Sequence, residues 1–285
     1  MKINKYPDGS SYVQLEKGFV KNSPITFRIN SYEDLWHLNQ YVDAKNSLGL
    51  TPHIIIPCLI DAQADRRFSY KQSFGLKLVC KFLNGLNATF TIFHPHNPES
   101  VLMGMDNVTI LDNAEFIRKV LSDLSTFQTK MPVKDQIEDL SNNLLLMSSD
   151  AGGYKPLMKL CDDIDWKGET YSASKSRSYA HGESKIVQHV DRDDFDGKDI
   201  LIIDDISVYG GTFKGLSKLL KARNCGKLYL AVSHMTVQDL GSDPVTNYFD
   251  KVFTTNSKFD SYYAGLYEHS QENLSKKNLE IIKLF

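Results

Sequence analysis

The fold class is decided by one stretch, Ile202-Ile203-Asp204-Asp205-Ile206-Ser207-Val208-Tyr209-Gly210-Gly211-Thr212-Phe213. An apolar strand leads into two carboxylates and a Gly-Gly-Thr turn, and the spacing of the leucines beyond the turn predicts a helix over 213–223. The amides of such a turn, together with a helix N-terminus, form a cradle for an anion. Adjacent carboxylates suit ribose hydroxyls or a magnesium ion. The pattern favours a sugar-phosphate site over the alternative, a strand end with a Thr N-cap and solvated acids.

The alternation of apolar runs and amphipathic stretches extends over most of the chain. A second helix is predicted over 73–86, and strands are predicted over 53–57, 89–93, 144–147, 199–203 and 227–232. Near-continuous Val, Ile and Leu strands separated by helices predict an α/β fold whose parallel sheets are covered on both faces. The polar connection 123–143 interrupts the alternation, so we expect two domains, 1–140 and 141–285.

Composition limits the class of protein. The 285 residues are 41% hydrophobic, which is enough for a packed core, and 33 basic against 35 acidic side chains exclude a strongly basic nucleic-acid binder. No apolar run approaches the ~18 residues of a membrane span, and residues 1–6 lack the apolar core of a signal peptide. The four cysteines are scattered, as expected of reduced core residues. We therefore expect a cytoplasmic protein with neither nucleic acid nor membrane as a partner.

Six segments together resemble one family. The stretch DDISVYGGTF resembles the phosphoribosyl-binding loop that type I phosphoribosyltransferases share with ribose-phosphate pyrophosphokinases, and this resemblance implies two phosphoribosyltransferase-like domains. Five further segments resemble the pyrophosphokinases' FPDGE, IPYxPYARQDR, DPH, SPDAGG and KxR motifs, and they lie at 6–13, 56–67, 93–96, 148–153 and 174–177. Plain phosphoribosyltransferases have only the later half of this series. Within the pyrophosphokinases, NSYEDLWHLNQ and QSFGLK resemble the divergent, virus-encoded branch, which implies the host cytoplasm as location.

The resemblance implies an activity and a site. The family transfers the β,γ-diphosphoryl group of ATP to the anomeric 1-hydroxyl of a ribose 5-phosphate moiety with Mg²⁺ as cofactor. Lys175, Arg177 and His96 are the implied catalytic residues, and His96 and Asp150 the implied metal-site residues. The implied ATP contacts are Asp8, Ser10, Gln63, Asp65, Arg66 and His96. The implied acceptor contacts are Asp204, Asp205, Ser207, Tyr209, Gly210, Gly211 and Thr212.

Two of these assignments carry further expectations. Lys175 and Arg177 lie in YSASKSRSYAHGES, a polar segment without periodicity that we expect to be a loop, and Asp150 has the alternative role of capping the next helix. In the family, the segment matching 6–11 completes the site of a neighbouring subunit. This feature implies a homodimer or a higher homo-oligomer.

Departures from the family pattern leave alternatives open. The usual strand and helix before FPDGE are missing, Ser10 replaces a glutamate, and Gln63 and Ala64 replace an arginine and a glutamine. Weakened nucleotide contacts would suit a non-catalytic regulatory homologue, whereas retention of Lys175 and Asp150 argues for an enzyme. A phosphoribosyltransferase that joins a base to an activated ribose is the third interpretation, and the FPDGE-like segment argues against it.

The acceptor loop departs most from the family. Val208 and Tyr209 stand where the family has an acid and a hydroxyl residue. A 5′-phosphate that continues into a second phosphate and a nucleoside is a monoanion and needs fewer donors, and an adenine in that nucleoside could stack on Tyr209. We therefore predict ADP-ribose as acceptor, giving ADP-ribose 1-diphosphate for NAD resynthesis. The alternative is ribose 5-phosphate, with Tyr209 packed on the sheet edge.

Overall fold

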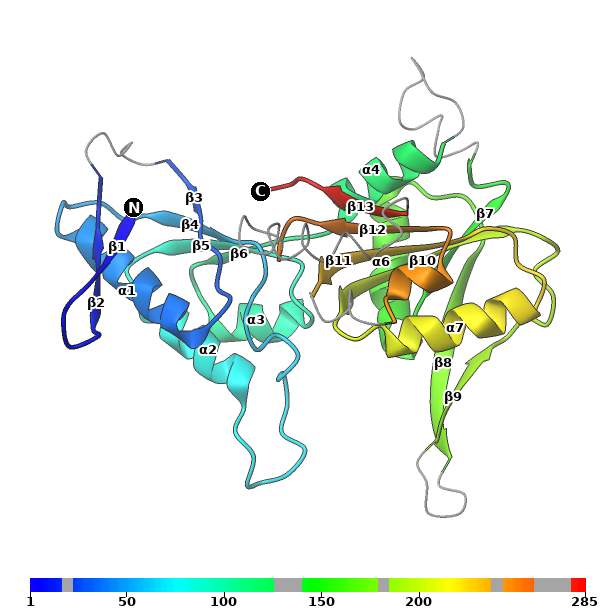
Figure 1. Ribbon diagram of the computed structural model, residues 1–285, viewed down its shortest axis with the longest axis horizontal. Coiled ribbons are helices and arrows are strands. Elements are labelled where there is room, and N and C mark those ends of the chain that lie inside the picture. Colours follow the sequence, from blue (N-terminus) through cyan, green and yellow to red (C-terminus); the bar gives the residue numbers. More distant parts are fainter. Residues whose placement is uncertain (17–22, 126–139, 179–184, 237–242, 259–277) are drawn as a thin grey trace. The chain divides into compact units, whose positions relative to one another are not determined.

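The structure is a computed structural model that describes residues 1–16, 23–125, 140–178, 185–236, 243–258 and 278–285 (Figure 1). The chain forms two compact units, Met1–Asp112 with Phe285, and Asn113–Leu284. This boundary lies before the predicted one at 140/141, because helix α4 (Ala114–Leu124) packs Phe116, Ile117 and Val120 into the core of the second unit. The resemblance described above implies ATP binding by the N-terminal domain and phosphoribosyl binding by the C-terminal domain, and both roles remain predictions.

The first unit contains a hairpin and a four-stranded parallel sheet in the order β3-β4-β5-β6. The hairpin strands are β1 (Lys2–Lys5) and β2 (Ser11–Gln14), and the sheet strands are β3 (Ile25–Thr26), β4 (His53–Ile56), β5 (Thr89–Phe93) and β6 (Val108–Leu111). The helices are α1 (Tyr32–Asn46), α2 (Gly75–Asn84) and α3 (Pro98–Gly104). The strands predicted over 53–57 and 89–93 and the helix predicted over 73–86 are confirmed within a few residues.

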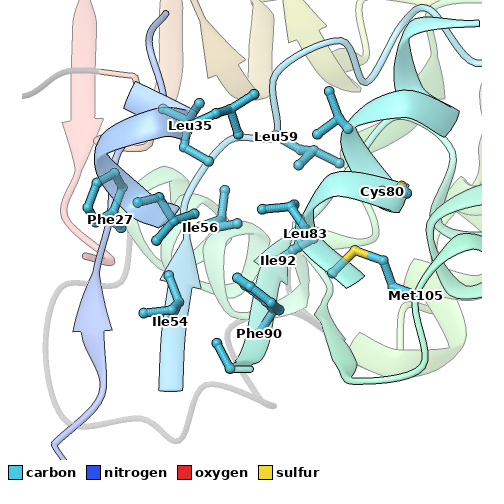
Figure 2. Close-up of a cluster of buried hydrophobic side chains, with 14 of the residues drawn as sticks. Phe27, Leu35, Ile54, Ile56, Leu59, Cys80, Leu83, Phe90, Ile92 and Met105 are labelled. Atoms are coloured by element: carbon cyan, nitrogen blue, oxygen red, sulfur yellow. The ribbon is translucent and has the colours of Figure 1, made fainter. Parts of the chain in front are cut away.

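The core of the first unit lies on one face of its sheet. Ile54, Ile56, Phe90 and Ile92 point from β4 and β5 toward the apolar sides of α1 and α2 (Figure 2). Their strand neighbours, such as His53 and the threonines of β5, are only half-buried or exposed. Among the described residues, the strands of this unit alternate in burial with period two over most of their length.

The second unit is built on a seven-stranded sheet in the order β13-β12-β11-β10-β7-β8-β9. Its strands are β7 (Leu144–Ser148), β8 (Thr170–Ser178), β9 (Lys185–Val190), β10 (Asp199–Ser207), β11 (Leu228–Met235), β12 (Lys251–Thr255) and β13 (Leu279–Ile282). Its helical segments are α4, η1 (Ala151–Gly153), α6 (Tyr154–Ile164), α7 (Gly211–Ala222) and η4 (Val245–Tyr248). All pairs are parallel except β8 with β9, which is antiparallel. The predicted strands over 144–147, 199–203 and 227–232 are confirmed.

Both faces of this second sheet are covered, as predicted. Helix α7 packs Phe213, Leu216 and Leu220 against one face, and α4 and α6 bury their apolar sides against the other. Three of the four cysteines are buried and Cys225 is half-buried, and all four are free thiols. None of the helices in the described parts of the chain is long and apolar enough to cross a membrane.

The order of strands places a site. The connection from β7 through α6 leads to β8 on one side of β7, whereas β10, β11 and β12 extend on the other side. Strands β7 and β10 therefore flank a topological switch point, where the loops that follow the two strands diverge, and ligands of open parallel sheets bind at the carboxyl ends of strands at such points. Ile203 pairs with Ser148, so Asp204 and Asp205 lie beside the residues that follow β7.

Candidate active site

Asp204 and Asp205 lie near the carboxyl end of β10, within the strand rather than after it. Ser149 donates a hydrogen bond to Oδ2 of Asp204, and the backbone N–H of Asp205 donates to Oδ1 at 2.8 Å. Burial of the carboxyl group, followed by the adjacent Asp205 carboxylate, raises the pKa of Asp204 to about 7. A carboxylate enclosed in this way gains from any cation or hydroxyl donor that a ligand brings.

The glycine turn that is predicted to cradle an anion leads directly into α7. Gly210 has φ +66° and precedes α7, whose first residue is Gly211. Within the described residues no side chain caps this helix, so the alternative of Thr212 as an N-cap is wrong. The amides of the first helical turn have no intrahelical acceptors and are available to an anion. Tyr209 is 71% exposed, so it does not pack on the sheet edge.

Thr236, which follows β11, holds the start of this turn. Its backbone N–H donates to the carbonyl of Ser207 at 3.0 Å, and its Oγ1 donates to the carbonyl of Val208 at 2.9 Å. Ser207 itself is 1% exposed, and its hydroxyl has no hydrogen-bond partner among the described residues. A buried hydroxyl without a partner costs free energy. The Ser207 hydroxyl is therefore available to form a hydrogen bond.

Asp150, which follows β7, contacts Lys175 on the neighbouring strand β8. Asp150 follows β7, accepts a hydrogen bond from the N–H of Gly153 at 3.2 Å, and so caps η1 as the alternative role predicted. Its Oδ2 also lies 3.1 Å from Nζ of Lys175. The prediction that Lys175 and Arg177 lie in a loop is wrong, because both lie in β8, which pairs with β9. Cross-strand pairing compensates for the weak apolar pattern of this segment.

The residues of the second unit fit a magnesium ion that arrives with a nucleotide. Among the described residues, no three carboxylate, His or Cys side chains gather into a ready-made metal site. Protein-bound Mg²⁺ commonly uses one or two carboxylates together with substrate phosphates and water, and Asp150 offers a partly exposed carboxylate directly after β7. Here Asp150 would hold the ion, which neutralises phosphate charge when bound. His96, the other predicted ligand, belongs to the first unit.

In the first unit, Asp65 organises the predicted nucleotide loop. Its carboxylate accepts hydrogen bonds from Nε and Nη2 of Arg66 at 2.8 and 2.9 Å and from Nδ2 of Asn97 at 2.9 Å. The Arg66 hydrogen bonds are the main cause that lowers the pKa of Asp65 to about 2. Asp65 is 8% exposed, whereas the Arg66 side chain is 63% exposed. The buried acid thus orients an exposed guanidinium, and His96 and Gln63 are also exposed.

Asp8 and Ser10 form a local turn between β1 and β2. Oδ1 of Asp8 accepts from the N–H and the hydroxyl of Ser10 at 2.9 and 2.6 Å, which lowers the pKa of Asp8. Gly9 has φ +88°, a conformation that glycine adopts readily, and both polar residues are exposed. Asp8 and Ser10 therefore lie at an accessible hairpin tip, as a contact to a ligand or a neighbouring chain requires.

The sequence resembles those of known proteins over most of its length. The chain is 24% identical over 237 residues to the ribose-phosphate pyrophosphokinase of Saccharolobus solfataricus, covering 81% of this chain and 74% of that protein. It is 23% identical over 261 residues to the enzyme of the same name from Sulfolobus acidocaldarius, covering 88% and 82%. No family model matches the sequence. The sequence relatives support the ribose-phosphate pyrophosphokinase family.

One solved structure has a similar fold. The crystal structure of phosphoribosylpyrophosphate synthetase from Mycobacterium smegmatis matches with a TM-score of 0.71 at 16% identity, over 99% of this chain and 85% of that one. This match confirms the predicted α/β fold of two phosphoribosyltransferase-like domains with mainly parallel sheets.

Three residues that organise these loops were not predicted from the sequence. Ser149 donates to Asp204, Thr236 holds the turn, and Asn97 connects Asp65 to the start of α3. A signal existed for Asn97, since an Asn before Pro is a common start of a helix. Ser149 and Thr236 act across strands that are distant in sequence, so their contacts depend on the sheet order.

Proposed function

We propose that this chain transfers the β,γ-diphosphoryl group of ATP to the anomeric 1-hydroxyl of a ribose 5-phosphate moiety. The observation that carries the proposal is the pair of half-buried acids, Asp204 and Asp205, followed by a glycine turn at a topological switch point. In the reaction, the hydroxyl oxygen bonds to the β-phosphorus while the bond from that phosphorus to the α,β-bridging oxygen breaks. AMP leaves, and the hydroxyl proton passes to solvent or to a basic group.

Different residues of the second unit bind the acceptor and stabilise charge during the transfer. Asp204 and Asp205 accept hydrogen bonds from the ribose hydroxyls, and the amides after Gly210 hold the 5-phosphate. Lys175, placed beside Asp150, supplies positive charge where charge moves during transfer. Arg177, two residues along the same strand, is proposed to act with it. Ser207 offers its buried hydroxyl to the loop.

ATP binding is proposed for the loops of the first unit. Arg66 is held outward by Asp65 and offers a cation for nucleotide phosphates, with Gln63 and His96 nearby in the predicted motifs. Asp8 and Ser10 at the hairpin tip would contact the adenine of a second copy of the chain, so we propose a homo-oligomer. We propose that the protein is a soluble, cytoplasmic enzyme and that it belongs to the virus-encoded branch.

ADP-ribose is the acceptor that we propose, giving ADP-ribose 1-diphosphate. The exposed ring of Tyr209 supports it, because an aromatic face at the entrance to the phosphate turn can stack on adenine. Val208 adds no donor for a terminal dianion. Ribose 5-phosphate is the competing acceptor, and a comparison of kcat/KM for the two compounds decides between them.

The test is incubation with ATP, Mg²⁺ and each acceptor, with AMP measured by chromatography. We expect AMP that depends on the acceptor and is lost in Lys175→Ala. Acceptor and ATP binding without AMP would favour a non-catalytic homologue. Release of diphosphate when a base and an activated ribose are supplied, without any need for ATP, would favour a phosphoribosyltransferase.

A further inference from the structure

The hairpin β8–β9 carries a residue that the proposed mechanism does not use. Gln188 on β9 is paired with Lys175 on β8, and residues directly opposite in antiparallel strands point to the same face. Toward the base of the hairpin, Ala173 and Val190 on this face belong to the core that includes α7. The rung formed by Lys175 and Gln188 therefore lies where the apolar core ends and the polar loops begin.

The two side chains of this rung reach different loops. Lys175 contacts Asp150 after β7 at 3.1 Å, and Nε2 of Gln188 donates to the carbonyl of Thr212 at 2.8 Å. Thr212 belongs to the turn whose amides form the anion cradle. One rung thus connects the loop that carries Asp150 with the turn that would hold the acceptor phosphate.

Helix α7 leaves room for this contact. A Cβ placed on Gly215 would lie 2.5 Å from Oε1 of Gln188, closer than two such atoms approach. Glycine inside a helix is less favourable than alanine, so its presence here points to a close approach that the fold requires. The Gln188 amide lies directly over this glycine and against the first turn of the helix.

We propose that Gln188 is a positioning residue, which fixes the phosphate-binding turn 210–212 relative to the hairpin that carries Lys175. The inference rests on the proposed function, because it assumes that the turn binds the acceptor. The contact with the Thr212 carbonyl leaves the amides of the turn pointing toward the ligand. Loss of this hydrogen bond would leave the residues of the turn unchanged but make the turn less ordered. A less ordered turn binds the acceptor more weakly.

Two variants disturb the contact in different ways. Gln188→Met keeps the length of the side chain but removes the donor. Gly215→Ala leaves Gln188 unchanged, displaces its amide, and improves the helix propensity of α7. His189→Ala is the matched control, because His189 lies on the same strand but on the opposite face, where it contacts Ser176 at 3.1 Å.

The experiment measures binding and turnover separately. Calorimetry with ribose 5-phosphate and with ADP-ribose, without ATP, gives the acceptor affinity, and steady-state assays give kcat and both KM values. We expect roughly three- to tenfold weaker acceptor binding in Gln188→Met and Gly215→Ala, the range of one neutral hydrogen bond. The KM for ATP and the binding by His189→Ala should stay at wild-type values.

The outcomes are distinct. If the melting temperature of Gly215→Ala is unchanged or higher while its acceptor affinity falls, general destabilisation is not the cause and positioning is supported. Unchanged acceptor affinity in both variants, or an equal loss of ATP and acceptor affinity, overturns the role of Gln188. If the wild-type chain binds neither acceptor, the acceptor site of the proposed function fails, and the role of Gln188 fails with it.

Discussion

Two aspartates, one in each unit, have opposite electrostatic surroundings. Asp65 is saturated by Arg66 and Asn97, which lowers its pKa to about 2. Asp204 is enclosed beside Asp205 with Ser149 as its side-chain donor, and its pKa is raised to about 7. The first acid is stabilised by contacts within the fold, whereas we propose that the second is stabilised when the acceptor binds. Buried charge left without compensation is costly and is typical of functional sites.

The two units also differ in the order of the strands in their sheets. The four described strands of the first sheet follow chain order, with no reversal. In the second sheet, the chain continues from β7 to one side and from β10 to the other side. Asp150 follows β7, and Asp204 lies near the carboxyl end of β10. Ligands of parallel sheets bind at such reversals, so the acceptor and diphosphate chemistry is proposed for the second unit.

The largest effect is expected for Lys175→Ala. Removing a cation that acts where charge moves lowers kcat by ~10²–10³ and leaves acceptor binding largely unchanged. Lys159→Ala is the control, because Lys159 forms a comparable ion pair with Asp163 at 2.6 Å on α6, outside the site. Rapid-quench measurement of AMP formation gives both values. Near-normal turnover in Lys175→Ala would contradict the catalytic assignment.

Replacing Asp204 with Asn should separate stability from function. Loss of a charged acceptor weakens acceptor binding by roughly ten- to a hundredfold. The ligand-free protein should become more stable near pH 7–8, because an enclosed charge is removed. Calorimetric binding and chemical denaturation measure the two effects. The double variant Asp204→Asn with Asp205→Asn should abolish acceptor binding, and wild-type affinity in that variant would refute both roles.

The pH dependence of stability gives the sign of the Asp204 contribution. Between about pH 4 and 7, the unfolded carboxyl group is ionised while the folded one keeps its proton. The folded state therefore binds more protons, and the free energy of unfolding falls as pH rises through this window, by on the order of 1–3 kcal/mol. Urea denaturation from pH 4 to 8 should show this fall in the wild type and a smaller one in Asp204→Asn. Parallel curves for the two proteins would contradict the raised pKa.

Asp65→Asn should have the opposite effect on stability. The lowered pKa of Asp65 stabilises the folded state above about pH 4, and this contribution is lost as pH falls toward 2. Because Arg66 is largely exposed, we expect a loss of only about 1–2 kcal/mol at pH 7. Thermal unfolding in parallel with Asp204→Asn tests the contrast. A stabilised Asp65→Asn variant would remove the distinction between the two acids.

The smallest effect is expected for Tyr209→Thr. Loss of one stacking surface should lower kcat/KM for ADP-ribose by about five- to tenfold, at the lower end of stacking contributions, and change that for ribose 5-phosphate little. The two acceptors serve as internal controls for each other in a single protein preparation. Equal changes for both, or a wild-type enzyme that strongly prefers ribose 5-phosphate, would refute ADP-ribose as the preferred acceptor.

The sequence predicted the features that depend on local pattern. The apolar runs over 144–147 and 199–203 are buried strands, and the glycine turn precedes α7. The sequence-based predictions were wrong for elements whose structure depends on tertiary contacts. The polar segment β8 is a strand because it pairs with β9, and α4 belongs to the second unit because of its core contacts. The contact between Ser149 and Asp204 spans 55 residues and follows from the order of β7 and β10. Local periodicity does not encode that order.

The identity of the products tests the central proposal most directly. After incubation with ATP, Mg²⁺ and either ribose 5-phosphate or ADP-ribose, mass spectrometry should detect AMP and, in equal amount, the acceptor carrying a diphosphate at C1. AMP without a modified acceptor would mean hydrolysis of ATP, and ADP with a singly phosphorylated acceptor would mean transfer of the γ-phosphoryl group alone. Either result, or the absence of any product with both acceptors, would contradict diphosphoryl transfer by this chain.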